Sequence, residues 1–75
     1  MNKRQMQTVK SEILDVQDII TYSYSRLGDA LLRLLEGKGK SILMYDESKY
    51  HLERMYYAFF KMKRLCDEMM EGTDA

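Results

Sequence analysis

The sequence predicts an all-α protein in which two long helices form an antiparallel hairpin that self-associates into a four-helix bundle. Three observations lead to this prediction. Apolar residues recur at alternating spacings of three and four in both halves of the chain. A glycine-rich segment separates the two halves, and the chain contains no proline that would interrupt a helix. A 3.5-residue repeat of this length is typical of helices that pack lengthwise on other helices.

The first helix is expected to run from about residue 3 to about residue 36. Gly28 lies inside this range, where a glycine costs about 1 kcal/mol relative to alanine. The repeat passes Gly28 without a change of phase, so we expect one continuous helix, bent there at most, instead of a break followed by a short helix capped by Asp29. Gly37 is placed as a C-cap glycine. The predicted apolar stripe consists of Met6, Val9, Ile13, Val16, Ile20, Ser23, Leu27, Ala30 and Leu34.

The second helix is expected from about residue 46 to about residue 71, after a connection over residues 37–45. Asp46 is the preferred N-cap, with Tyr45 and Tyr50 placed as a hydrophobic staple. Ser41 is the alternative cap, and would bring residues 42–45 into the helix. Residues 73–75 are expected to fray. The predicted core stripe consists of Leu52, Met55, Phe59, Met62, Cys66 and Met69.

Charge placement favours the antiparallel arrangement. Acidic residues gather at the end of the second helix, where the helix dipole disfavours negative charge. An antiparallel hairpin would bring them beside Lys3, Arg4 and Lys10 of the first helix. The acidic residues are Asp67, Glu68, Glu71 and Asp74.

Self-association is expected because a chain of 75 residues is near the lower limit for a single self-sufficient core. The one cysteine, Cys66, excludes an internal disulfide, and one histidine with one cysteine is too few for a structural zinc site. The apolar surface of each helix is also wider than a single seam, which indicates more than one neighbouring helix. The additional apolar residues are Ile19, Tyr24, Leu31, Tyr56, Leu65 and Met70.

Composition narrows the possible partners. Twelve basic and twelve acidic residues give a formal net charge of zero, which argues against wholesale adsorption to nucleic acid or a membrane. No apolar run approaches the length of a transmembrane helix, and the first residues lead into no signal sequence. A free thiol without an export signal predicts a cytoplasmic location. We expect no cofactor and no metal.

The strongest candidate site lies on the side of the second helix that faces away from the predicted core stripe. Tyrosines, a phenylalanine and arginines on a solvent-side face are typical of a protein interaction hot spot. Such residues are also able to stack on bases while cations contact phosphates. The alternative interpretation is a second internal packing face. The residues are Tyr50, Arg54, Tyr57, Phe60, Lys61 and Arg64.

Two other motifs favour structural roles. Gly39-Lys40-Ser41 matches the end of a phosphate-binding loop, but Leu34 stands where its first glycine belongs and the segment follows a helix. We therefore interpret it as a turn with exposed lysines. His51 has Glu47 and Tyr50 nearby but lacks a nucleophile or a second metal ligand, so we expect a partly buried, non-catalytic histidine. The acids Asp15, Asp18 and Asp29 are expected to form a solvated strip.

These features together predict a small non-enzymatic interaction protein, an adaptor or an inhibitor, that docks a protein partner through the outer face of the second helix. Small, cysteine-poor chains of this kind are common among phage and mobile-element proteins that block a host machine. One alternative is a small-ligand binder at a dimer interface. Another is a nucleic-acid-binding regulator that uses the basic segment 38–64. Its basic residues are Lys38, Lys40, Lys49, Arg54, Lys61, Lys63 and Arg64.

Overall fold

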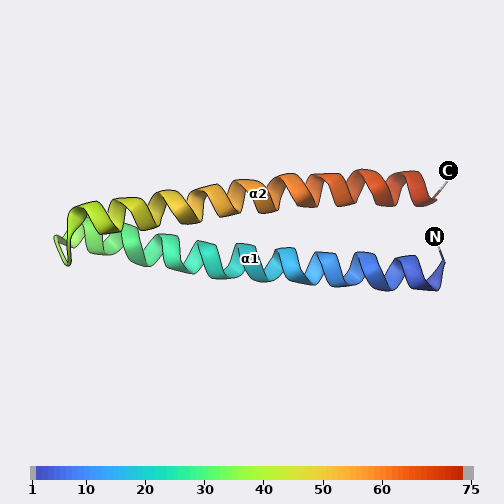
Figure 1. Cartoon of the computed structure of the whole chain (residues 1–75), viewed down its shortest axis with the longest axis horizontal. Helices are drawn as coiled ribbons and strands as arrows, with labels where there is room; N and C mark the ends of the chain where they lie inside the picture. The colour runs from blue at the N-terminus through green and yellow to red at the C-terminus, as the bar shows by residue number, and fades with distance from the viewer. Residues whose placement is uncertain (1, 74–75) are drawn as a thin grey trace.

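The protein is a two-helix hairpin. The computed structural model describes residues 2–73, which form helix α1 (Lys3–Glu36), a short connection and helix α2 (Ser41–Thr73). The helices lie side by side, with the connection at one end and both termini at the other (Figure 1). The hairpin is 53 Å long and measures 17 by 13 Å across. The prediction of an all-helical antiparallel hairpin is confirmed.

Helix α1 has a defined start and a defined stop. The Asn2 side chain accepts a hydrogen bond of 2.8 Å from the backbone N–H of Gln5, and the Gln5 side chain accepts one of 2.9 Å from the N–H of Asn2. This reciprocal capping box satisfies two N–H groups that the first turn leaves unpaired. At the other end Gly37 adopts the left-handed conformation, with φ of 71°. The N–H of Lys38 donates to the Arg33 carbonyl, which completes a Schellman cap.

The boundaries of α1 agree with the expected ones, and the helix passes Gly28 without a break. Helix α2 differs, because it begins at Ser41, five residues before the expected cap at Asp46. Gly37 and Gly39, both with positive φ, are sufficient to reverse the chain, so no longer loop is needed. The Lys40 carbonyl then accepts the first helical hydrogen bonds, from Leu43 and Met44.

At its other end α2 runs through Gly72 to Thr73, beyond the expected stop near residue 71. The fraying expected for residues 74 and 75 falls outside the described residues.

The seam between the helices is formed mainly by small residues. Val16, Ser23 and Ala30 are the buried residues of α1, and they lie on the stripe predicted for that helix. Of the nine residues in the predicted stripe, Met6 is an exception, because its side chain is largely exposed. The buried residues of α2 are Ser48, His51, Ala58 and Leu65.

The prediction for α2 is therefore wrong by one position along much of the seam. Ala58 is 0 % exposed while the neighbouring Phe59 is 51 % exposed. Leu52 and Cys66 are exposed in the same way, and Leu65 takes the place that the prediction gave to Cys66. The methionines of the predicted stripe, Met55, Met62 and Met69, stay at the seam but are only half-buried.

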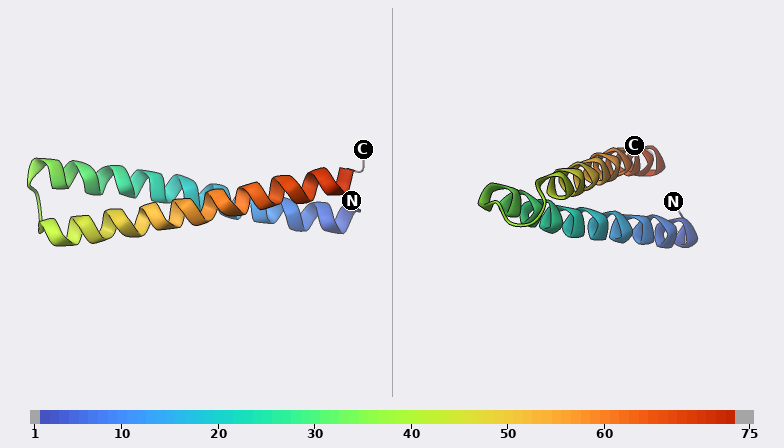
Figure 2. Two further views of the ribbon diagram at one scale, coloured as in Figure 1. Left: turned by 90° about the horizontal axis from the view of Figure 1, so that it is seen from above. Right: turned by 60° about the vertical axis from the view of Figure 1, so that its left-hand side comes forward.

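This rotation of α2 has a simple packing reason. Two helices alone share one line of contact, and dispersion attraction along it is greatest where the backbones approach closely. Small residues such as Ala30 and Ala58 permit that approach, whereas Phe59 in the same line would hold the helices apart. The helices cross once when seen from above, so the line of contact winds around both (Figure 2).

Charge pairing does not join the two helices. The ion pairs of the described residues are Lys38 with Glu36, Arg64 with Glu68, and a 3.8 Å contact between His51 and Glu47, and none connects α1 to α2. Within residues 2–73 the acids near the end of α2 form no ion pair with Lys3, Arg4 or Lys10, although Glu68 and Arg4 line the same groove as the antiparallel arrangement predicts. Exposed ion pairs contribute little stability, so the seam, not charge, holds the helices together.

Candidate interaction surfaces

The hairpin presents two long faces of different chemistry, one on each side of the seam. In both helices the positions one and four residues after a buried seam residue lie on one side, and those one and four residues before it lie on the other. Because the helices are antiparallel, the same offset in α1 and α2 points to the same face of the hairpin. Ser23 in α1 and Ala58 in α2 are two of the buried seam residues from which these offsets are counted.

The grooves at the open end of the hairpin agree with this division. One groove is lined mainly by apolar side chains, including Met6, Ile13, Leu14 and Met69, together with Lys10. A second groove shares Val9 and Gly72 with the first but is lined otherwise by polar and charged side chains, including Gln5, Glu12 and Glu68. The same point of the seam is therefore mainly apolar on one side and mainly polar or charged on the other.

We call the first surface the apolar face. Its inner line is half-buried against the seam, and its outer line is exposed. No charged residue occupies the inner line, although charged residues make up 32 % of the chain. Two lysines lie at the edge of this face, Lys10 after Val9 and Lys49 after Ser48, and Lys49 Nζ is 5.6 Å from the centroid of the Tyr45 ring. The inner line consists of Ile13, Ile20, Leu27, Leu34, Met55, Met62 and Met69. The outer line consists of Tyr24, Leu31, Tyr45, Leu52, Phe59 and Cys66.

We call the opposite surface the tyrosine–cation face. Its tyrosines and cations are Tyr22, Arg26, Tyr50, Arg54, Tyr57, Lys61 and Arg64. The same offsets also place Glu12, Asp15, Ile19, Asp29 and Glu47 on this face. Three of its tyrosine rings carry a cation from one helical turn further on. The distance from the charged group to the ring centroid is 5.1 Å for Arg26 over Tyr22. It is 5.7 Å for Arg54 over Tyr50 and 5.9 Å for Lys61 over Tyr57.

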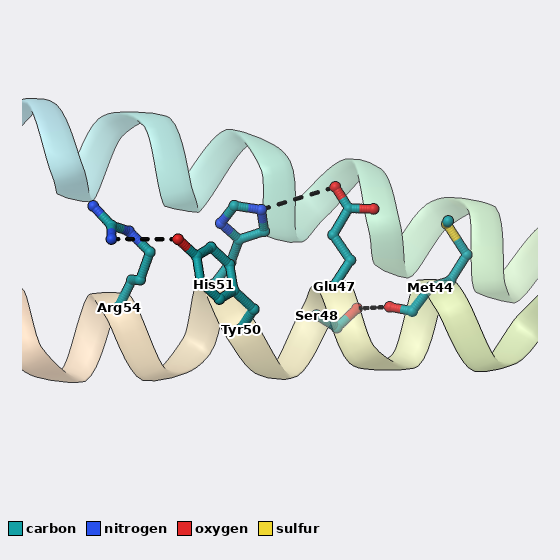
Figure 3. Close-up of polar contacts among 6 residues, drawn as sticks. All are labelled: Met44, Glu47, Ser48, Tyr50, His51 and Arg54. Atoms are coloured by element: carbon teal, nitrogen blue, oxygen red, sulfur yellow. Dashed lines mark hydrogen bonds and ion pairs between the residues drawn. The ribbon is translucent and has the colours of Figure 1, made fainter.

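His51 connects the two helices on this side. The residue is 4 % exposed, and its ring makes edge-to-face contacts with Tyr22 of α1 and Tyr50 of α2, at centroid distances of 5.9 and 5.1 Å. Figure 3 shows His51 between the helices, with Glu47 and Arg54 reaching in the same direction from α2. His51 is thus fully buried, where the sequence predicted partial burial, and its contacts position the two tyrosines.

The seam contains two polar atoms without a hydrogen-bond partner among the described residues, His51 Nδ1 and Ser23 Oγ. Ser48 differs, because its hydroxyl donates to the Met44 carbonyl at 2.8 Å (Figure 3). A buried polar group that lacks a partner costs stability, so the seam is not optimised for the hairpin alone.

The structure brings most of the predicted site residues together. Tyr50, Tyr57 and Arg64 follow one exposed line of α2, with Arg54 and Lys61 half-buried beside them. Phe60 is exposed but lies further around the helix, in a shallow depression with Lys63, Arg64 and Asp67.

The sequence prediction missed the contribution of α1. Tyr22 and Arg26 complete the tyrosine–cation face, and their spacing of four matches that of Tyr50 with Arg54 and of Tyr57 with Lys61. This repeated tyrosine–cation spacing was the available signal.

Several kinds of site find no support within residues 2–73. Among these residues no group of three His, Cys, Asp or Glu side chains is placed to hold a metal ion. None of the helices in this part of the chain is long and apolar enough to cross a membrane. The acids Asp15, Asp18 and Asp29 are exposed, as expected. No protein-family model, curated protein or solved structure matches the chain.

Proposed function

We propose that the protein is a non-enzymatic, self-associating interaction module. In this proposal the apolar face binds a second copy of the chain to form a four-helix bundle. The tyrosine–cation face, which includes the outer residues of α2, then remains exposed for a protein partner, as in an adaptor or an inhibitor. The observation that carries the proposal is the apolar face, which has no charged side chain along its inner line.

The accessible area supports a second copy as the occupant of this face. The hairpin exposes 6218 Å², whereas a compact monomer of 8.9 kDa would expose about 4,800 Å². The excess is about 1,400 Å², and a protein interface of standard size removes about 800 Å² from each partner. Burial of one face of the hairpin would therefore bring the exposed area per chain close to that of a compact protein.

The chemistry of the apolar face also suits association with itself. A two-fold symmetric interface places the same surface on both subunits, so it must be complementary to itself. Like charges would oppose each other across such an interface, and the inner line of the apolar face has none to oppose. Its half-buried methionines, Met55, Met62 and Met69, have flexible side chains that adapt to a facing helix.

Two adjacent phenylalanines provide the test. Phe59 lies on the apolar face, and Phe60 lies outside it on the same helix; both are exposed in the hairpin. Phe59→Glu should shift the mass measured by sedimentation equilibrium from dimer toward monomer, because it places a charge in the proposed interface. Phe60→Glu makes the same chemical change and should leave the mass unaltered. A wild-type chain that sediments as a monomer at tens of micromolar would refute self-association.

A further inference from the structure

We infer that the second copy packs antiparallel on the apolar face, so that the connection end of each hairpin fills the apolar groove at the open end of the other. This inference rests on the proposed function, because it specifies how the second copy lies on the face that it would cover. It also assigns an occupant to the groove, namely Leu31, Leu34 and Tyr45 of the second copy.

The apolar face is hollow at the open end of the hairpin. The seam position of α2 at this end is Gly72, two heptads after Ala58, and it has no side chain to cover Val9, which lines the same groove. Val9 is therefore only half-buried, whereas Val16, the next seam residue of α1, is 1 % exposed. The groove has a volume of about 580 Å³, and Lys10 in its lining is able to keep its ammonium group in water while its stem covers apolar surface. Such a hollow gains most from apolar side chains that a partner inserts.

At the connection end the same face is closed, and large side chains project from it. The seam residues Ala30 and His51 are 2 % and 4 % exposed, so the two helices are in close contact there. Leu31 and Tyr45 lie beside this closed seam and are 48 % and 52 % exposed, and Leu34 of the inner line is half-buried. The two ends of the apolar face are therefore complementary, because one end is a hollow and the other carries side chains of the kind that fill it.

Two-fold symmetry allows two orientations for hairpins that pack through the same face. If both connections lie at the same end of the bundle, each groove faces the other groove, and the projecting side chains of the two connection ends meet each other. If the connections lie at opposite ends, each groove faces the connection end of the other copy. Protein interiors are close-packed, and empty apolar space costs stability, so the second orientation is favoured.

The positions of these side chains fit a single two-fold axis. In the antiparallel orientation each helix faces its own counterpart in the second copy, so the axis lies midway between the residues that pair. The midpoint of Met6 and Leu34 on α1 is residue 20, and the midpoint of Tyr45 and Met69 on α2 is residue 57. Both midpoints are close to the middle of their helices. One axis through the middle of the hairpin therefore seats both pairs and lets the two apolar faces overlap along their full length.

The orientation is tested by measuring the distance between two spin labels, one on each full-length chain of the dimer, by double electron–electron resonance. The label is attached at Lys40→Cys in the connection, in a Cys66→Ala background. In the antiparallel dimer these labels lie at opposite ends and should be about 50 Å apart, at 1.5 Å per residue. With both connections at one end they would be about 20 Å apart. The control label, at Ser25→Cys in the same background, is exposed near the middle of α1 and should give less than about 35 Å in either orientation.

Two adjacent leucines test the occupant of the groove. Leu31 and Leu32 are exposed to a similar degree in the hairpin, 48 % and 56 %, but Leu31 lies on the apolar face and Leu32 lies outside it. Leu31→Ala should raise the dimer dissociation constant, measured by sedimentation equilibrium, by about tenfold or more, because each dimer loses two side chains from its grooves. Leu32→Ala removes the same atoms outside the face and should change that constant by no more than about twofold.

The contrary results separate the inference from the proposed function. A main distance below about 40 Å between the Lys40→Cys labels would overturn the antiparallel orientation, while the proposed self-association would stand. Equal effects of Leu31→Ala and Leu32→Ala would exclude Leu31 from the groove and also overturn the inference. A dimer distance at neither label position would show a monomer and would refute the proposed function itself.

Discussion

The two faces of this hairpin lie on either side of one seam, but they differ in the chemical groups that they leave exposed to water. On the apolar face, large side chains such as Ile20 and Met62 are half-buried, so water still reaches apolar area that the fold does not cover. On the tyrosine–cation face, charged groups are solvated and three of them rest on rings of their own helix. Binding of almost any complementary apolar surface to the apolar face is therefore favourable. Binding to the tyrosine–cation face depends mainly on a ligand whose charged groups complement those of the face.

This difference follows from where the small residues lie. Ser23, Ala30 and Ala58 occupy the line of closest approach, which displaces the larger apolar residues to one side of the seam. A single pair of helices cannot bury that side, and a second pair can. The same packing that makes the hairpin narrow thus creates the surface on which we expect it to associate.

A substitution in the seam that divides the two faces should have the largest effect on the free energy of unfolding. Leu65→Ala removes a side chain that is 2 % exposed and should lower the free energy of unfolding by about 2–5 kcal/mol, the range for truncation of a buried leucine. The adjacent Cys66→Ala, at an exposed position, should change it by less than about 0.5 kcal/mol. Urea titration followed by circular dichroism measures both, and the reverse order would show that α2 is rotated toward Cys66.

The apolar face should make stability depend on concentration. If unfolding is coupled to dissociation of a dimer, a tenfold increase in chain concentration adds about 1.4 kcal/mol of stability and raises Tm by several degrees. Thermal melts over a hundredfold concentration range measure this. The Phe59→Glu chain should lose most of the dependence, because it has lost the interface. A wild-type Tm that does not change with concentration would show that the apolar face does not bind a second copy of the chain.

The polar layer of the seam should give a smaller effect, of the opposite sign. Ser23→Ala removes a buried hydroxyl that lacks a partner and improves helix propensity, so we expect about 1 kcal/mol of stabilisation. Ser48→Ala removes a hydroxyl that donates to the Met44 carbonyl and should be close to neutral. Destabilisation by Ser23→Ala in urea titration would indicate that the Ser23 hydroxyl has a partner in the assembled protein.

The tyrosine–cation face should give the smallest effect on folding. The double change Tyr57→Ala with Arg64→Ala removes exposed side chains and should alter the free energy of unfolding by no more than about 0.5 kcal/mol. Helicity and sedimentation mass should also stay constant, while capture of a protein partner weakens. Early melting or a fall in mass would instead identify this face as a packing surface.

The sequence alone determined that the chain forms two helices in this order, the bounds of α1 and the seam of α1. The apolar residues of α1 repeat at heptad spacing along one stripe, so this stripe was predicted to face α2, and Gly37 marks the end of the helix. The spacing of α2 likewise predicted that Met55, Met62 and Met69 lie near the seam. Tyr50, Tyr57 and Arg64 were placed correctly on an exposed line.

The tertiary structure decided the rotation of α2 and the composition of both faces. Helix α2 carries apolar or aromatic residues on nearly all sides, so several rotations bury a similar amount of apolar area and periodicity cannot choose among them. The choice came from the partner helix, whose small residues Ser23 and Ala30 permit close approach and favour Ala58 over Phe59 in the line of contact. The same contact brought Tyr22 of α1 against the ring of His51, which Tyr50 also contacts, a proximity between distant residues that only packing creates.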